Sequence, residues 1–284
     1  RDPHESPLER LTGLIASIWP QEGRVAAIAV AAPGPIDPET GVVLTAPNIP
    51  GWRDVPLRET VEDRFHVPAA VGNDANLAAL GEWKFGAGKG HHPLLYLTIS
   101  PGIGGGVIID NRLLLGRHGL GGELGHITLL PDGPLCGCGQ RGHLEALSSG
   151  TAIANWVQEQ IEQGAQTSLS AAAPVTARMV STAAQEGDPL AVSAFHRAGY
   201  FLGIALANFL HIFNPSVVVL GGGVTRSGPL LLEPMHASLR ERLLDPSYLH
   251  DLVITPAAFG DDAGLMGALA LASETASSSI LTAK

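Results

Sequence analysis

Four short apolar runs, each closed by a turn of glycine, proline or asparagine, restrict the fold of this chain more than any other feature. They occupy residues 24–32, 67–71, 94–100 and 217–220. An apolar run of this length that ends in a turn is typical of a strand buried on both faces of a parallel sheet. Residues 55–65, between the first two runs, are predicted to form a helix. Strand, helix and strand in that order predict a βαβ unit, and therefore an α/β protein.

The composition favours the same class. The 284 residues include 35 glycines and 21 prolines, which are too many for a helical bundle and are typical of an α/β protein with tight turns. An apolar fraction of 45% and a mean hydropathy of +0.20 are enough for a buried core. Ser6 and Asp188, each followed by proline, are expected to cap helices. We predict further helices at residues 6–19, 75–85, 151–163, 189–213 and 262–276, and a hairpin whose turn is Asp110-Asn111.

The charge balance and the cysteines exclude several classes of protein. Lys and Arg number 17 against 27 Asp and Glu, and the formal net charge of −10 has the wrong sign for a nucleic-acid-binding surface. No uninterrupted apolar run has the length of a membrane span, and no signal peptide opens the sequence, so a cytoplasmic protein is expected. One residue separates Cys136 from Cys138, so a disulfide between them would be badly strained, and a framework of bridges is excluded.

Residues 126–143 contain a group of candidate metal ligands. His126, Cys136, Cys138 and His143 are of the types that Zn²⁺ prefers, and four such side chains form the closed tetrahedral site of a structural metal. The glycines within residues 137–142 would let the backbone turn tightly enough to bring three of the ligands together. The alternative is two surface thiols beside unrelated histidines. We predict the zinc site.

Residues 72–76, Gly-Asn-Asp-Ala-Asn, stand where a predicted strand ends and a helix begins. Ligands of open α/β sheets gather at the carboxyl ends of the strands, so Asp74 can face a substrate there. An aspartate is ionised at pH 7 and can accept a hydroxyl proton as a general base. The alternative is an ordinary helix cap, a role that Asp and Asn both fill well.

Two glycine clusters follow predicted strands, at residues 102–106 and 221–223. Backbone amides at such turns can hold phosphate oxygens, which suits an acidic protein with few cations to spare for a nucleotide. Neither cluster has the spacing of a P-loop or of a dinucleotide-binding motif. Tight turns or close packing would explain the same glycines, so both interpretations stay open.

Taken in order, these motifs resemble those of the ROK family, whose name stands for repressors, open reading frames and sugar kinases. The matching segments are residues 32–35 with 41–43, 47–52, 73–82, 102–106, 122–126, 136–145, 221–223 and 261–264. They follow the family order across essentially the whole chain. The resemblance implies an α/β fold of the actin-like, hexokinase type, with two lobes. It places residues 1–90, together with a C-terminal helix at 262–284, in the smaller lobe, and residues 91–261, with the zinc loop, in the larger one.

The resemblance also implies individual roles. Asp74 corresponds to the catalytic base that acts on the sugar 6-hydroxyl, and His126 is similar to the family histidine that both binds zinc and reaches a sugar hydroxyl. The implied sugar site comprises Asn48, Asn73, Asp74, Glu123, His126 and Glu145. The implied nucleotide-facing residues are Gly102, Gly104, Gly105, Gly222 and Gly223. The implied cofactors are ATP, Mg²⁺ and a structural Zn²⁺, and the implied assembly is a homodimer or a homotetramer.

The sequence departs from the family pattern in three places. His143 stands where the family usually has a third cysteine, and a site of two Cys and two His still suits zinc. Pro101 stands where the kinases usually carry threonine, so a hydroxyl and an amide donor are lost beside the phosphates. The family's N-terminal hairpin with its Asp-x-Gly-Gly-Thr phosphate loop does not occur within these residues. We expect that a polypeptide beginning at Arg1 would retain sugar affinity and have negligible kinase activity.

Two functions of different classes fit the resemblance. The first is an ATP-dependent hexose kinase, with glucose as the expected substrate. The second is a transcriptional repressor or sugar sensor that binds the sugar as an inducer without catalysis. The acidic charge and the lack of a DNA-binding helix pair in these residues favour the kinase, whereas Pro101 favours the repressor. A phosphate-loop hairpin upstream of Arg1 would indicate a kinase, and a longer basic segment would indicate a repressor.

Overall fold

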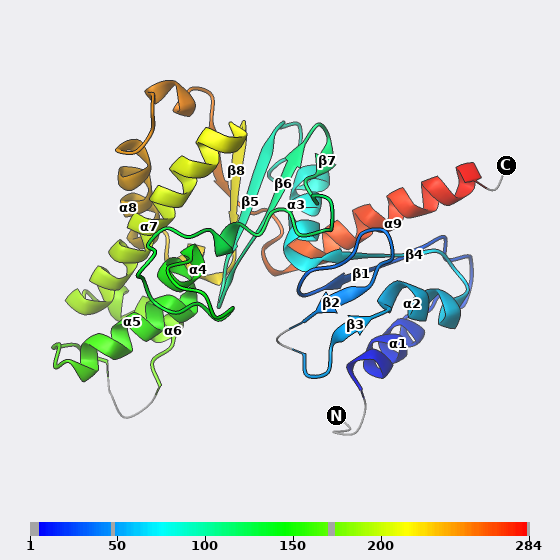
Figure 1. The fold of residues 1–284 in the computed structure, drawn as a ribbon, viewed down its shortest axis with the longest axis horizontal. Coiled ribbons are helices and arrows are strands. Elements are labelled where there is room, and N and C mark those ends of the chain that lie inside the picture. Colours follow the sequence, from blue (N-terminus) through cyan, green and yellow to red (C-terminus); the bar gives the residue numbers. More distant parts are fainter. Residues whose placement is uncertain (1–5, 47–48, 170–173, 283–284) are drawn as a thin grey trace.

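The computed structural model describes residues 6–46, 49–169 and 174–282. Figure 1 shows them arranged as two lobes, with α3 (Asp74–Phe85) and α9 (Ala263–Thr282) lying between the two main sheets. The larger lobe is built on a five-stranded sheet in the order β7-β6-β5-β8-β9. Strands β5, β8 and β9 are parallel to one another, and β6 and β7 pair antiparallel. The strands are β5 (Leu94–Ile99), β6 (Ile103–Ile109), β7 (Arg112–Leu113), β8 (Val217–Gly221) and β9 (Val253–Pro256).

The strands predicted at 94–100 and 217–220 are confirmed as β5 and β8. The predicted hairpin is confirmed as β6 and β7, which pair antiparallel. Asp110 and Asn111 both have positive φ angles, of 51° and 61°. That conformation belongs to a two-residue type I′ turn, which Asn and Asp tolerate better than most residues.

Five helices cover the sheet of the larger lobe. Two of them, α5 and α7, match predicted helices, and Asp188 caps α7 as expected. The other three, α4, α6 and α8, were not predicted, and α8 contains Pro234 within its length. The helices are α4 (Leu144–Ser148), α5 (Gly150–Glu162), α6 (Ala177–Gln185), α7 (Pro189–Phe213) and α8 (Pro229–Arg240).

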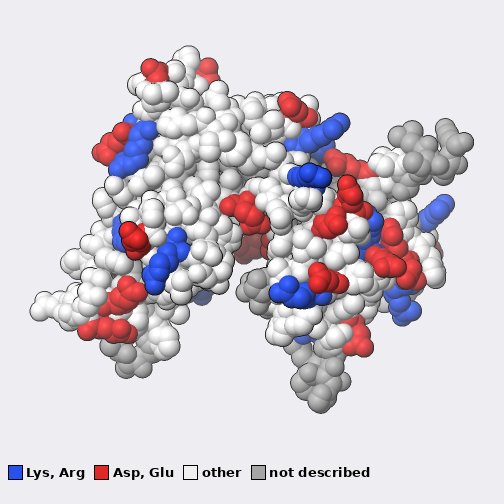
Figure 2. Space-filling model, viewed as in Figure 1, with Lys and Arg blue, Asp and Glu red and all other residues white. Residues whose placement is uncertain are grey.

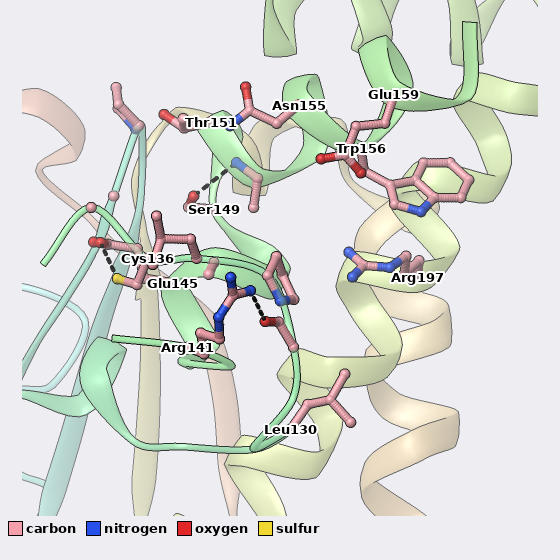
Figure 3. Close-up of a pocket in the computed structure, with 18 of the residues that line it drawn as sticks. Leu130, Cys136, Arg141, Glu145, Ser149, Thr151, Asn155, Trp156, Glu159 and Arg197 are labelled. Atoms are coloured by element: carbon pink, nitrogen blue, oxygen red, sulfur yellow. Dashed lines mark hydrogen bonds between the residues drawn. The ribbon is translucent and has the colours of Figure 1, made fainter. Parts of the chain in front are cut away.

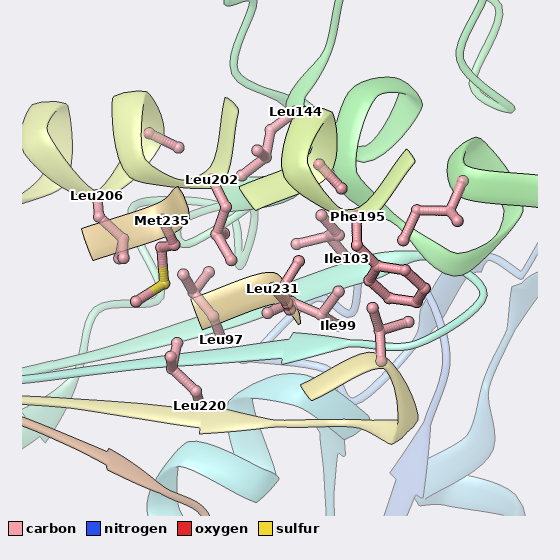
Figure 4. Close-up of a cluster of buried hydrophobic side chains, with 14 of the residues drawn as sticks. Leu97, Ile99, Ile103, Leu144, Phe195, Leu202, Leu206, Leu220, Leu231 and Met235 are labelled. Atoms are coloured by element: carbon pink, nitrogen blue, oxygen red, sulfur yellow. The ribbon is translucent and has the colours of Figure 1, made fainter. Parts of the chain in front are cut away.

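The main hydrophobic core lies between this sheet and the α7–α8 pair (Figure 4). Leu202 and Leu206 of α7 pack with Leu231 and Met235 of α8, and all four side chains are fully buried. The two helices approach closely at a glycine: a Cβ on Gly203 would lie 2.4 Å from the Met235 carbonyl oxygen. Leu220, near the end of β8, belongs to the same core, so this packing fixes the strand end at which the glycine cluster 221–223 begins.

α7 is long and apolar enough to cross a bilayer, the one such helix in the part of the chain that the structure describes. An 18-residue window of it has a mean hydropathy of 1.3, and 56% of that window is buried inside the protein. Its buried face identifies it as the core helix predicted for residues 189–213.

The smaller lobe contains the predicted βαβ unit. β1 (Ile28–Ala32) and β4 (Ala69–Asn73) are parallel neighbours, and α2 (Leu57–Phe65) lies between them in the chain. The predicted strand at 24–32 is thus shorter than expected. A second, antiparallel pair, β2 (Val43–Thr45) and β3 (Arg53–Val55), was not predicted. α1 (Pro7–Ser17) begins with the expected Ser6 cap, which forms a capping box with Glu9.

α3 and α9 cross in direct backbone contact. A Cβ on Gly81 would lie 2.7 Å from the Ala263 carbonyl oxygen, and one on Gly267 would overlap the Leu77 carbonyl group. α3 also packs on β6, since a Cβ on Gly106 would lie 2.5 Å from that of Ala79. The helix that was predicted for the smaller lobe therefore packs firmly on the sheet of the larger lobe, and the boundary near residue 90 stays a prediction.

Candidate functional site

The junction of β4 and α3 forms the centre of the candidate site. β1 and β4 are in register, with Ala32 opposite Asn73, so both strands end at one edge. The side-chain oxygen of Asn73 accepts hydrogen bonds from the N–H groups of Ala75 (3.0 Å) and Asn76 (3.1 Å). The helix cap is therefore Asn73, and Asp74 is the first residue of the helix, so its carboxylate is not the cap.

The amide of Asn73 is largely occupied by the fold. Besides capping α3, its Nδ2 donates a hydrogen bond of 3.1 Å to the Gly34 carbonyl oxygen, which ties the β1 turn to the β4 turn. Its predicted contact with sugar stays a prediction. Asn48, also predicted for the sugar site, lies outside the described residues.

The Asp74 carboxylate lies near that of Glu123, on whose pKa its charge acts. One oxygen accepts a hydrogen bond of 2.8 Å from the N–H of Ala75. The surrounding protein nevertheless desolvates the carboxylate, and this raises its pKa above the ordinary 3.8 in spite of that bond. A carboxylate with a raised pKa is a stronger base than an ordinary aspartate, so the environment suits proton abstraction.

Glu123 and His126 belong to a different segment from Asp74. His126 ends the short helix η1 (Leu124–His126), and Glu123 directly precedes that helix. Glu123 Oε2 is 4.0 Å from His126 Nε2. Desolvation raises the pKa of Glu123; the nearby His126 lowers it, and the charges of Asp74 and Glu145 raise it further. Three carboxylates, those of Asp74, Glu123 and Glu145, therefore lie close enough for their charges to interact. Figure 2 shows the molecule hollowed between the lobes, with acidic side chains on the wall of the hollow.

The four predicted metal ligands do come together. The ligand atoms of His126, Cys136, Cys138 and His143 all lie within 4.8 Å of one another. Cys136 Sγ is 3.8 Å from His126 Nδ1, and Cys138 Sγ is 3.3 Å from His143 Nδ1. The two histidines therefore lie beside the two thiols, and the zinc ion itself stays a prediction. Two thiolates and two imidazoles at this spacing fit a tetrahedral Zn²⁺ site.

The His126 ring connects this cluster to the cleft. Its Nδ1 faces Cys136, whereas its Nε2 faces Glu123. An imidazole presents its two nitrogens on opposite sides, so one ring can contact a metal and still offer its other nitrogen to a ligand in the cleft.

Glu145 makes a second connection between the cluster and the cleft. Its Oε1 accepts a hydrogen bond from Cys136 Sγ (3.3 Å), and its Oε2 accepts one from the Ile103 N–H (2.9 Å). A Cβ at position 102 would lie 2.5 Å from that second oxygen, so an added side chain would displace the carboxylate. Gly102 therefore lies against Glu145, beside the predicted sugar site.

The remaining predicted nucleotide-facing glycines fall into two groups. Gly104 and Gly105 lie inside β6, where a Cβ would meet Ala75 at 2.8 Å or the Leu124 side chain at 2.6 Å. Close packing, the alternative interpretation, explains these two, and their contact with a nucleotide stays a prediction. Gly222 and Gly223 follow β8, with a φ of +88° at Gly222 that an L side chain rarely adopts.

A cavity of about 760 Å³ opens beside Gly223. Ser100 and Pro101 line it from one side, and an ion pair of Arg226 and Asp261, with a shortest N–O distance of 3.1 Å, lies at its wall. This cavity is large enough for a nucleoside. The ion pair carries no sequence signal of its own and was not predicted.

A second cavity, of about 1030 Å³, lies behind the metal cluster (Figure 3). Cys136 and Glu145 line one side, and Trp156 and Arg197 of α5 and α7 line the other. Both cavities share Pro101, so the proline that departs from the family pattern stands between them.

The solved structures to which the chain is similar have the actin-like, two-lobed ATPase fold, which confirms the predicted fold class. A sequence model of the ROK family matches residues 1–275, and the chain therefore belongs to the ROK family. It is 39% identical to a glucokinase of Thermotoga maritima over 87% of this chain and 79% of that one. It is 37% identical to a glucokinase of Streptomyces coelicolor over 88% of this chain and 81% of that one.

Structural comparison gives relatives of both functional classes. A ROK family glucokinase from Streptomyces griseus, solved with glucose and AMPPNP, matches 94% of this chain and 87% of that one with 36% identity and a TM-score of 0.80. A ROK family transcriptional regulator, a homologue of the E. coli Mlc protein, matches 95% of this chain and 67% of that one with 32% identity and a TM-score of 0.85.

Proposed function

We propose that the protein phosphorylates a hexose at its 6-hydroxyl with ATP, and that the hexose is glucose. One observation carries the proposal: the carboxylate of Asp74, which Asn73 relieves of helix capping and whose pKa is raised, lies near Glu123, which in turn lies 4.0 Å from His126. The similarity to glucokinases over most of the chain supports the same conclusion.

In this proposal Asp74 accepts the proton of the attacking hydroxyl. The raised pKa makes the carboxylate a stronger base than an ordinary aspartate, because desolvation by the surrounding protein favours the protonated form. Glu123, His126 and Glu145 hold the sugar, because each hydroxyl removed from water needs a hydrogen-bonding partner. Glu145 cannot shift freely, since the Ile103 N–H and Cys136 hold its two oxygens.

His126, Cys136, Cys138 and His143 would hold the zinc ion. When bound, it would stabilise the loop that carries these residues, without acting on the substrate itself. His126 and Glu145 both contact Cys136 and both belong to the proposed sugar site, so a stable loop would hold these two side chains in place for the sugar.

In this proposal the nucleotide binds in the cavity beside Gly223, close to the turn at Gly222, and Mg²⁺ would neutralise charge on its phosphates when bound. Bare amides after β8 can approach phosphate oxygens closely. Pro101, at the margin of the same cavity, offers no N–H there. Transfer of the phosphoryl group then depends mainly on positioning and on neutralising charge.

The test is nucleotide-product release by the protein with its natural N-terminus against a panel of glucose, mannose, fructose and N-acetylglucosamine. We expect turnover with glucose to exceed the others in kcat/KM. Absence of turnover with every sugar, in a sample that binds glucose, would contradict the kinase.

A sugar-responsive repressor is the second candidate. The transcriptional regulator matches this chain with a TM-score of 0.85, and xylose repressors of Caldicellulosiruptor bescii and Bacillus subtilis are each 34% identical, although the chain spans only 61% and 59% of their lengths. Sugar-dependent release of a DNA operator, without any turnover, would favour this candidate.

A further inference from the structure

Glu82, near the end of α3, is a fully buried carboxylate that the proposed chemistry does not use. It accepts three backbone hydrogen bonds: Oε2 from the N–H of Ala87 (2.9 Å) and of Ala258 (3.1 Å), and Oε1 from that of Phe259 (2.9 Å). No ion pair with Glu82 occurs among the residues that the structure describes. Within the described part of the chain, the hydrogen bonds to this buried carboxylate all come from backbone N–H groups.

These bonds join segments that are far apart in the sequence. Ala87 follows α3, whereas Ala258 and Phe259 lie 176 and 177 residues beyond Glu82, in the stretch between β9 and α9. That stretch continues into η4 (Gly260–Asp262), and its Asp261 lines the cavity beside Gly223. One end of the bonded segment is therefore part of the proposed nucleotide site.

α3 carries this connection to the proposed base. Asp74 and Glu82 are eight residues apart in one helix, or about 12 Å along its axis. The helix cannot slide easily, because Ala75 packs on Gly104 and Gly81 packs on the backbone of α9. A rigid helix thus has the proposed base at its first residue and the anchor of residues 257–262 in its last turn.

We propose that Glu82 is a positioning residue that holds residues 257–262, and with them Asp261 at the nucleotide cavity, in register with Asp74. This inference rests on the proposed function. It assigns Glu82 no contact with substrate. Its effect reaches the reaction only through the N–H groups of Ala258 and Phe259.

The chemistry of the anchor requires a carboxylate. All three partners are N–H donors, and a carboxylate offers only acceptors. A glutamine of the same shape would turn its own NH₂ group toward at least one of these donors. Glu82→Gln is therefore the smallest change that breaks the anchor.

Gly86 supplies an independent way to disturb the same anchor. A Cβ at this position would lie 2.2 Å from Glu82 Oε2 and 2.8 Å from the Phe259 ring. Gly86→Ala thus displaces the carboxylate without removing it. The matched control is Glu62→Gln: Glu62 also accepts a backbone hydrogen bond, from Ala69 (2.9 Å), but wholly within the smaller lobe.

The experiment measures glucose and AMPPNP affinities by calorimetry, kcat and KM for both substrates, and hydrogen exchange of residues 257–262, in the full-length protein. For Glu82→Gln and Gly86→Ala we expect faster exchange in that segment, AMPPNP affinity and kcat/KM for ATP about tenfold or more lower, and a glucose Kd within about twofold of the parent. Glu62→Gln should lower the melting temperature and leave the nucleotide constants unchanged.

The outcomes separate this inference from the proposed function. If the parent binds glucose and AMPPNP but shows no turnover, the kinase proposal fails and the AMPPNP affinities of the variants still decide the role of Glu82. If both variants lose only thermal stability, with parental nucleotide constants, the positioning role is wrong. It is also wrong if the parent binds no nucleotide, or if Glu62→Gln changes the nucleotide constants as much as Glu82→Gln does. If Glu82→Gln fails to fold, Gly86→Ala carries the test.

Discussion

Two sets of acidic residues in this protein have opposite surroundings. Glu82 and Asp188 are enclosed by the protein, and backbone or hydroxyl donors occupy their oxygens. The protein desolvates Asp74 and Glu123 but gives them few hydrogen-bond donors. Each set has one member in α3, Glu82 or Asp74, and one member directly before a helix, Asp188 or Glu123. The position in the secondary structure therefore does not explain the difference between the two sets.

The pKa directions follow these surroundings. Burial alone would raise the pKa of Asp188, but hydrogen bonds from Ala191, Ser168 and Thr167 outweigh it and hold the pKa at about 2. For Asp74 desolvation outweighs its one hydrogen bond, and the pKa rises. A carboxylate whose acceptors are filled stabilises the fold, whereas one left short of donors retains its affinity for a proton and can do chemistry. Mutations can test this contrast directly.

The largest effect is expected for Asp74→Asn. Loss of a general base commonly lowers turnover by about 10²- to 10⁴-fold, while the Asn73 cap of α3 remains intact. The melting temperature should not fall, because the variant removes a charge that the protein desolvates. Turnover of glucose and thermal melting of the same samples measure both effects.

Asn73→Ala is the matched control for that variant, since it removes the cap and keeps the carboxylate. It should cost about 1 kcal/mol of stability. Near-parental turnover of Asp74→Asn would show that Asp74 is not the base.

The second effect concerns the metal cluster. Chelation of the metal, or Cys136→Ser, should weaken glucose binding by about tenfold or more, because Glu145 and His126 both contact Cys136. Metal analysis of protein purified without added zinc should find one equivalent per chain. Gln140→Ala, in the same loop but with an exposed side chain that is not a ligand, is the control. Unchanged glucose affinity in the zinc-free protein would overturn the connection between the loop and the sugar site.

The sequence predicted local features better than distant ones. Short apolar runs that end in turns identified β5, β8 and the βαβ unit, and the ligand types and spacing identified the group of potential metal ligands, because each signal lies within one short stretch of the chain. The roles of Glu82 and Gly86 have no such signal. Their partners lie across the chain, and only packing brings Phe259 against them. α8 was missed because its Pro234 is a poor sign of a helix.

A third effect tests the enclosed carboxylates. Asp188→Asn should lower the free energy of unfolding by about 2 kcal/mol, because it disturbs both the cap of α7 and the bonds to Ser168 and Thr167. Glucose turnover per folded molecule should match the parent. Urea unfolding with the steady-state assay measures the two quantities, and a loss of turnover without a loss of stability would contradict the contrast.

The smallest effect concerns pH: on acidification the protein should lose activity at a higher pH than the one at which it unfolds. Because the pKa of Asp74 lies above 3.8 in the folded protein, kcat/KM should fall as the pH drops through that raised value, since the base must be ionised. Protonation of Asp74 itself favours the folded state: the stability it adds is full below the unfolded pKa and disappears as the pH rises through the folded pKa. Asp188 acts in the opposite direction, adding stability above an unfolded pKa of about 3.8 that is lost only as the pH falls toward about 2.

Below the raised pKa of Asp74 but above about pH 2, where Asp188 is still ionised, the protein should therefore be folded and inactive. Activity should be recovered on return to neutral pH. Near-UV circular dichroism and turnover, recorded on one sample across the acid range, test this. Glu123 also has a raised pKa, so Glu123→Gln is needed to assign the limb: the part of the acid limb that remains in this variant belongs to Asp74. If activity and tertiary structure are lost at the same pH, acid unfolding accounts for the fall in kcat/KM, and protonation of the base does not. The contrast between carboxylates that stabilise the fold and carboxylates that accept a proton would then be wrong.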